Sequence, residues 1–156
     1  MMKVFDASSG ALQRTYEGHT HHVLGVSWRG DGKLLASCGA DNAVKMWDVA
    51  TGEQPRPAHA TPKEATAIRF VPLTTKVLVA CGDKTLRLFE TNVGGGQDRA
   101  YSGAADYLYS LSVSRDGKTV IAGGQDSTLR LWNVDNGQII REFPAPPADG
   151  ATVAKQ

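Results

Sequence analysis

The sequence predicts an all-β protein made of repeated four-stranded antiparallel sheets, and two observations support this fold class. First, aromatic residues recur at steps of 42, 42 and 43 residues, namely Phe5, Trp47, Phe89 and Trp132. Second, apolar and polar residues alternate in the segments that lead to these aromatics, and a period of two is typical of short β-strands. No segment keeps a helical period. The repeat therefore defines the organisation of the chain before any local motif is considered.

Turn residues divide each repeat into four strands. Asp31-Gly32 and Asp116-Gly117 are expected to close the hairpin between the first and second strands, and Thr51-Gly52 and Asn136-Gly137 to join the third to the fourth. A partial repeat precedes the complete ones, with strands expected at 1–6 and 10–16. In the complete repeats, strands are expected at 22–28, 33–38, 43–48 and 53–57, then at 64–70, 76–81, 84–90 and 97–101, and finally at 107–113, 118–123, 127–133 and 137–143.

The best-preserved repeat resembles a WD40 repeat of a β-propeller. Gly18-His19 is followed, 28 residues after the histidine, by Trp47-Asp48. The other repeats depart from this pattern, with Ala58-His59 and Phe89-Glu90 in one and Gly103-Ala104 in the other. The resemblance implies a WD40-type arc of about 3.5 four-stranded blades. Its parts are the outer two strands of an incomplete blade at 1–16, blades at 17–57, 58–101 and 102–143, and a Pro/Ala-rich tail or linker at 144–156.

In this family a hydrogen-bonded set of His, Ser or Thr, Asp and Trp joins the strands of a blade, and the matching residues are His19, Ser37, Asp41 and Trp47. Such groups can satisfy one another when they are buried. The second and third blades keep only part of the set, namely His59 and Asp83 in one and Asp126 and Trp132 in the other. The missing members are replaced by Ala80, Phe89, Ala104 and Ala122. We expect these two blades to depend on apolar packing instead.

A basic residue stands two positions before each recurring aromatic, at Lys3, Lys45, Arg87 and Arg130. We expect the aliphatic stems of these side chains to cover the neighbouring blade while their charges reach water.

The resemblance also implies a partner-binding surface on the narrow top face, beside the start of each first strand and the end of each second. Carried over by position, the top face consists of His22, Leu24, Ala40, Glu64, Thr66, Gly82, Tyr107, Tyr109 and Gln125. Tyr107 and Tyr109 share one side of a strand, and exposed aromatic pairs are typical interface anchors. The alternative, that one or both rings pack against an adjacent blade, stays open.

Composition and motifs disfavour several other functions. Seventeen Lys and Arg against sixteen Asp and Glu give a net charge of +1, too little for general binding to nucleic acid or an anionic membrane. The cluster of His19, His21 and His22 lacks a Cys or carboxylate at ligand spacing, so we expect no metal, and we expect no cofactor. No nucleophile, paired-acid or nucleotide-binding motif occurs, so we expect no enzyme. Two cysteines without CxxC spacing and no visible signal peptide favour the cytoplasm.

These observations favour a non-enzymatic scaffold that binds a protein or peptide on the top face. One alternative is a region of a larger multidomain protein, linked to an enzyme or to electron transfer, and another is a homo-oligomerising half-propeller. Closed propellers use about 4 to 8 blades, so an arc of this length leaves apolar sheet faces bare. We expect missing chain segments or a second copy to cover them.

Overall fold

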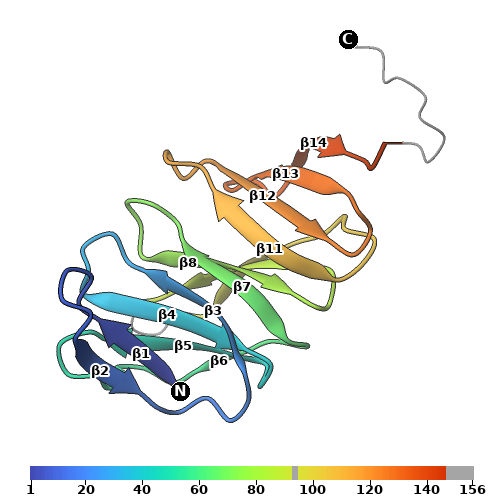
Figure 1. Ribbon diagram of the computed structural model, residues 1–156. Coiled ribbons are helices and arrows are strands. Elements are labelled where there is room, and N and C mark those ends of the chain that lie inside the picture. The colour runs from blue at the N-terminus through green and yellow to red at the C-terminus, as the bar shows by residue number, and fades with distance from the viewer. Residues whose placement is uncertain (93–94, 147–156) are drawn as a thin grey trace.

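The computed structural model describes residues 1–92 and 95–146, and within them the chain forms fourteen strands in four antiparallel sheets (Figure 1). A two-stranded sheet comes first, and three four-stranded sheets follow in the orders β3-β4-β5-β6, β7-β8-β9-β10 and β11-β12-β13-β14. The predicted all-β arc is thereby confirmed. No helix in the described ranges is long and apolar enough to cross a membrane. The segment expected at 144–156 lies outside the described residues from 147 onward.

The strands agree with their predicted positions to within two residues, except for β6. The partial sheet contains β1 Met2–Phe5 and β2 Leu12–Tyr16. The three full sheets contain β3 Val23–Trp28, β4 Leu34–Gly39, β5 Ala43–Asp48 and β6 His59–Ala60; β7 Ala65–Phe70, β8 Lys76–Cys81, β9 Leu86–Glu90 and β10 Gln97–Tyr101; β11 Leu108–Val113, β12 Thr119–Gly124, β13 Leu129–Asn133 and β14 Ile139–Phe143.

The fourth strand of the first full sheet lies later in the chain than the predicted 53–57. Pro55 and Pro57 have no amide hydrogen to donate to a neighbouring strand, so this stretch cannot pair along its length with β5. Pairing resumes only at β6, where His59 faces Val44 and Ala60 faces Ala43. The first full sheet therefore extends past residue 57, where we expected the next blade to begin.

Two predicted Asp-Gly turns shape the hairpins β3-β4 and β11-β12. Gly32 and Gly117 adopt φ angles of 71° and 72°, a left-handed conformation that glycine accepts without steric cost. In each turn the aspartate accepts a hydrogen bond at 3.0 Å from the amide two residues later. These local bonds fix where the second strand of each of these sheets begins.

The full sheets pack face to face through their first and second strands, with β7 against β3 and β4, and β11 against β7 and β8 (Figure 1). Val44 and Ile68 are fully buried between the first and second full sheets, and Leu86 and Trp132 between the second and third. The partial sheet packs on the first full sheet, where Tyr16, Leu35 and Trp47 form a smaller cluster.

A recurring contact shows that the partial sheet occupies the place of the outer half of a blade. The Tyr16 hydroxyl donates to the Val49 carbonyl at 3.3 Å, and the Tyr101 hydroxyl donates to the Val134 carbonyl at 2.7 Å. Both partners of the second bond lie 85 residues after those of the first, which is two repeat lengths. β2 therefore meets the first full sheet as β10 meets the third.

The two ends of the arc expose positions that are buried in the middle. Val26 of β3 is 51% exposed, whereas the equivalent Ile68 is 0% exposed and Leu111 is 3% exposed. At the other end Leu129 of β13 is 49% exposed, whereas Val44 at the same repeat position is fully buried. The apolar surface that we expected at the two ends is therefore present in the described residues.

Candidate functional site

In the first full sheet a chain of buried hydrogen bonds links the top loop to β4 and β5. The Trp47 indole Nε1 donates to Ser37 Oγ at 2.8 Å, and Ser37 Oγ lies 2.7 Å from Nε2 of His19. Nδ1 of His19 donates to Asp41 Oδ2 at 2.8 Å, because a carboxylate can only accept. The Thr20 amide donates to the same oxygen at 3.1 Å. The side chains of His19 and Asp41 are 1% and 6% exposed, so these groups satisfy one another inside the blade.

The carboxylate of Asp41 is held in its ionised form. Burial acts to raise its pKa, but the hydrogen bonds from His19 and the Thr20 amide outweigh burial and lower the pKa below the usual 3.8. The four groups therefore fix strands to one another, and their geometry leaves no side chain directed toward an incoming ligand.

In the second and third full sheets an arginine binds the corresponding aspartate. Arg87 forms an ion pair with Asp83, and Arg130 forms one with Asp126. Arg130 also donates from Nε to Glu142 at 2.6 Å and is only 7% exposed. The expectation that these charges reach water was wrong, because the aspartate four residues earlier draws each guanidinium into the sheet. These blades keep a polar network and do not depend on apolar packing alone.

Both ion-paired aspartates are more acidic than usual. Burial acts to raise their pKa values, and hydrogen bonds from the arginine and from nearby groups lower them further than burial raises them. Sequence reasoning missed these pairs, although the signal was present: in both units an arginine follows the turn aspartate after four residues, where the first unit has Lys45. Lys45 donates to the Gly18 carbonyl instead.

His59 does not belong to a network of this kind. It lies in β6, and its ring stacks on Phe89 with centroids 5.2 Å apart. Within residues 1–92 and 95–146, no hydrogen bond joins His59 to Asp83, so its assignment to the blade network was wrong. The residue one repeat length of 42 after His19 is Thr61. His59 lies two residues earlier, in the displaced strand β6, and therefore does not occupy the position of His19.

Trp132 keeps a hydrogen-bond partner although its sheet lacks the serine. Its Nε1 donates to the Ser102 carbonyl at 3.0 Å. Strand pairing also places Val79 of the second sheet at the position of Ser37, one residue before the expected Ala80. The serine hydroxyl of the first sheet therefore has no counterpart in the second.

The top face is held by the same backbone hydrogen bond in every full sheet. The amide just after the second strand donates to the carbonyl just before the first strand, at 2.8–2.9 Å. The donor–acceptor pairs are Ala40 and His22, Gly82 and Glu64, and Gln125 and Tyr107. This bond brings the residue before the first strand next to the residue after the second strand in each full sheet.

Tyr107 and Tyr109 contact each other on the third sheet, with ring centroids 5.1 Å apart and planes inclined by 40°. Tyr109 is 54% exposed, and its hydroxyl donates to Gln125 Oε1 at 2.8 Å. Tyr107 is half-buried because its ring lies over Gly82 of the neighbouring sheet; a Cβ at Gly82 would lie 2.4 Å from Tyr107 Cε2. One tyrosine thus packs on the adjacent blade, and the other presents its ring to solvent.

The remaining residues of the top face differ in their accessibility. His22 is exposed and contacts His21 edge to face at 4.5 Å, and Leu24 is 46% exposed. Thr66 is engaged in the interior: its hydroxyl lies 2.8 Å from the Leu108 carbonyl and 3.1 Å from the Ala80 carbonyl. Thr66 therefore ties the second sheet to the third.

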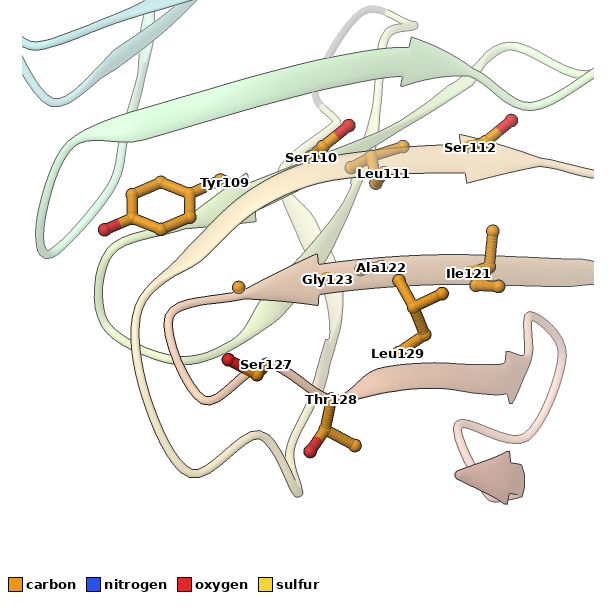
Figure 2. A pocket seen from close by; sticks show the side chains of 11 residues that line it. Tyr109, Ser110, Leu111, Ser112, Ile121, Ala122, Gly123, Ser127, Thr128 and Leu129 are labelled. Atoms are coloured by element: carbon orange, nitrogen blue, oxygen red, sulfur yellow. The ribbon is translucent and has the colours of Figure 1, made fainter. Parts of the chain in front are cut away.

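A hollow of about 570 Å³ lies on the exposed face of the third sheet (Figure 2). Tyr109 stands at one end of it, Ile121 and Leu129 lie along its length, and short side chains such as those of Ser110 and Ala122 leave the space open. The corresponding faces of the first two sheets are covered by β7 and β11. The hollow is therefore the place where the first strand of another sheet would pack.

The two cysteines do not form a reactive site. Cys38 and Cys81 are both fully buried. Burial raises the pKa of Cys38 to about 12, and burial also raises the pKa of Cys81. Both thiols are consequently protonated at neutral pH. In the described part of the chain, no group of three or more His, Cys, Asp or Glu residues could hold a metal ion.

Comparison with known proteins agrees with this architecture. The family model described as "WD domain, G-beta repeat" matches residues 10–48 and 96–133. The chain is 33% identical over 144 residues to nuclear distribution protein PAC1 of Arthroderma otae. The aligned segment covers 85% of this chain and 31% of PAC1. It is 26% identical over 129 residues to protein tipD of Dictyostelium discoideum, covering 83% of this chain and 21% of tipD.

A third relative, autophagy-related protein 16 of Arabidopsis thaliana, is 25% identical over 142 residues, covering 90% of this chain and 28% of that protein. The chain spans less than a third of the length of these three curated relatives. The matched segments contain the His19 network and the Asp126–Arg130 pair, and the stride of 42 to 43 residues continues between them. The chain belongs to the WD40-repeat family.

Proposed function

We propose that this chain is a non-enzymatic interaction module that binds a protein or peptide on its top face. Membership of a family of repeat scaffolds favours this role, and the fold alone does not name the partner. The observation that carries the proposal is the tyrosine pair: Tyr109 is 54% exposed and rests against Tyr107. A large ring with a polar tip at a fixed place is typical of interface anchors.

The tyrosines are arranged for binding before a partner arrives. Tyr107 is supported by the backbone at Gly82, and the Tyr109 hydroxyl is held by Gln125. Since the rings are already ordered, binding would lose little side-chain freedom. His22 and Leu24 extend the proposed surface onto the first sheet. We leave Thr66 out of it because its hydroxyl is engaged between sheets.

Three features favour a binding role over catalysis. The turn aspartates are hydrogen-bonded to His19, Arg87 or Arg130, the thiols are protonated, and among the described residues the top face offers no hydrogen-bonded nucleophile and base. General acid–base or nucleophilic catalysis needs such a pair within hydrogen-bond reach.

The test compares two exposed positions at opposite ends of the sheets. A photo-crosslinking amino acid is placed at Tyr109 or at Leu73, which is 101% exposed in the turn between β7 and β8. After exposure to a cell extract, the position-109 chain is expected to capture a partner that the position-73 chain does not. Tyr109→Ala should then weaken binding of that partner by about 10-fold or more.

Capture of the same proteins from both positions, or an unchanged affinity of the Tyr109→Ala chain, would remove the tyrosine pair from the binding surface. Circular dichroism of each variant checks that the sheets are intact.

As a second candidate function, we propose that the end faces of the arc pack against further sheets of the same repeat, in a longer protein or in a second copy. The exposure of Val26 and Leu129, at positions that are buried elsewhere in the arc, supports this proposal. Sedimentation of the full chain tests the second-copy form: a mass of 16.6 kDa at all concentrations would exclude it. Twice that mass, reduced to 16.6 kDa by Leu129→Asp, would support it.

A further inference from the structure

Glu64 differs from the turn aspartates of the second and third sheets. Asp83 and Asp126 each have a paired arginine. Glu64 forms no ion pair with any of the described residues, and it is only half-buried. A carboxylate beside solvent that has no ion-pair partner can accept a cation from a partner protein.

Glu64 and the tyrosine pair lie next to each other. The Glu64 carbonyl accepts from the Gly82 amide at 2.9 Å, and the Tyr107 ring covers that same glycine. Burial raises the pKa of the Tyr107 phenol, and the neighbouring Glu64 carboxylate raises this pKa further. Tyr109 then adds a second ring, 5.1 Å from Tyr107.

We infer that Glu64, Tyr107 and Tyr109 form a subsite for a cationic side chain, lysine or arginine, on the protein or peptide that binds the top face. The inference rests on the proposed function, because the subsite is part of the same surface. Two tilted rings present electron-rich faces that attract an ammonium or guanidinium group. The Glu64 carboxylate adds a charge-assisted hydrogen-bond acceptor at the edge of the rings.

Other ligand chemistries fit this position less well. A phosphate or an acidic side chain would approach Glu64 against its charge, and Lys84 already donates from Nζ to the Ala105 carbonyl at 3.0 Å. A purely apolar side chain would bury the carboxylate of Glu64 without a partner. A cation on an aliphatic stem satisfies both requirements, since the stem covers the rings and the charge reaches the carboxylate.

The experiment titrates the full chain with two small probes that share the same carbon chain, N-acetyl-lysine methylamide and N-acetyl-norleucine methylamide, which lacks the terminal ammonium group. Binding is followed by NMR of the tyrosine ring carbons. The lysine probe is expected to shift the ring signals of Tyr107 and Tyr109 and to bind about 2- to 5-fold more tightly than norleucine.

Matched variants separate the two sources of attraction. Glu64→Gln should reduce affinity for the lysine probe by about 2- to 5-fold, whereas Glu53→Gln, which removes the same charge from an exposed turn at the other end of the sheet, should leave it unchanged. Tyr109→Leu should reduce the preference for lysine over norleucine, and Tyr109→Phe should keep it, because only the latter retains an aromatic face.

Each other outcome overturns the inference. Equal binding of lysine and norleucine would make the subsite apolar, and equal effects of Glu64→Gln and Glu53→Gln would reduce it to general charge attraction. If neither probe shifts the tyrosine rings while the position-109 crosslink still captures its partner, the top face binds that partner without a cation subsite. If the crosslink fails as well, the proposed function is also refuted.

Discussion

Replacing Ser37 by alanine should destabilise the first full sheet by more than the loss of one hydroxyl group suggests. Ser37 Oγ accepts from the Trp47 indole at 2.8 Å and lies 2.7 Å from Nε2 of His19. Ser37 is fully buried, Trp47 is 1% exposed, and the side chain of His19 is 1% exposed. The alanine variant thus leaves two polar nitrogens without a partner and without access to water.

The size of the effect follows from those two groups. Each buried polar group that loses its partner costs about 1–3 kcal/mol, so two such groups would cost about 2–6 kcal/mol. His19 keeps its bond to Asp41, so we expect Ser37→Ala to lower the free energy of unfolding by about 2–4 kcal/mol, the lower half of this range. In the second sheet Val79 and Phe89 occupy the serine and tryptophan positions, so neither hydroxyl nor indole is present and nothing is left unpaired.

The second sheet suggests the assay, a double-mutant cycle of Ser37→Ala and Trp47→Phe measured by urea unfolding with circular dichroism. Trp47→Phe should cost less in the Ser37→Ala background than in the original chain, because it removes an indole N–H that the first substitution had stranded. We expect a coupling free energy of about 1–2 kcal/mol. Additive effects of the two substitutions would refute the hydrogen-bond reasoning and attribute both losses to packing.

Three further predictions concern burial and protonation. Ile68→Ala should lower the free energy of unfolding by about 2–4 kcal/mol. Val26→Ala, at the equivalent exposed position, should lower it by less than about 0.5 kcal/mol. Similar urea midpoints for the two variants would contradict the packing of β3 and β7. The pKa of Asp41 is lowered in the folded chain, so its contribution to stability is present above the usual value of 3.8 and is lost as pH falls below it. Asp41→Asn should flatten the pH dependence of urea unfolding there, and an unchanged slope would argue against the hydrogen bonds that the Asp41 carboxylate accepts. Cys38 and Cys81 should react with a thiol reagent only after unfolding, since both are buried; reaction of the native chain in seconds would show that the core opens.

The repeat positions of the strands could be predicted from the sequence because several local signals agree. The aromatic stride fixes the third strand of each sheet, and Gly32 and Gly117 mark the turns that begin the second. β6 was misplaced because alternation was followed through Pro55 and Pro57, although neither can donate to a sheet. A stricter use of proline as a strand breaker would have moved β6 toward its observed place.

The side-chain partners were harder to predict than the strands. His19 could be assigned to the hydrogen-bond network of its blade because its spacing to Trp47 is nearly that of the family pattern. His59 was assigned to such a network by residue type, although the repeat length of 42 residues places Thr61 at the position of His19. The role of Tyr107 was undecided because it depends on Gly82, a residue of another sheet, and sequence spacing within one strand carries no information about that neighbour.

The aspartate at the turn between the second and third strands is the constant element of all three full sheets, while the side chain that binds it changes. Asp41 is bound by a histidine, and Asp83 and Asp126 are bound by arginines. In the first and third sheets the carboxylate also accepts from the amide of Thr20 or Ala105, residues at the same repeat position.

In the second sheet the corresponding position is Pro62, which has no amide hydrogen, and the Asp83 carboxylate accepts from the Thr85 amide and from Arg87. A side-chain donor reaches the carboxylate either from the loop before the first strand or from the third strand, so the acceptor cannot be lost without leaving donors unpaired. The divergence of the second and third units from the family pattern at this position is therefore a replacement of one hydrogen-bond donor, the histidine, by another, the arginine.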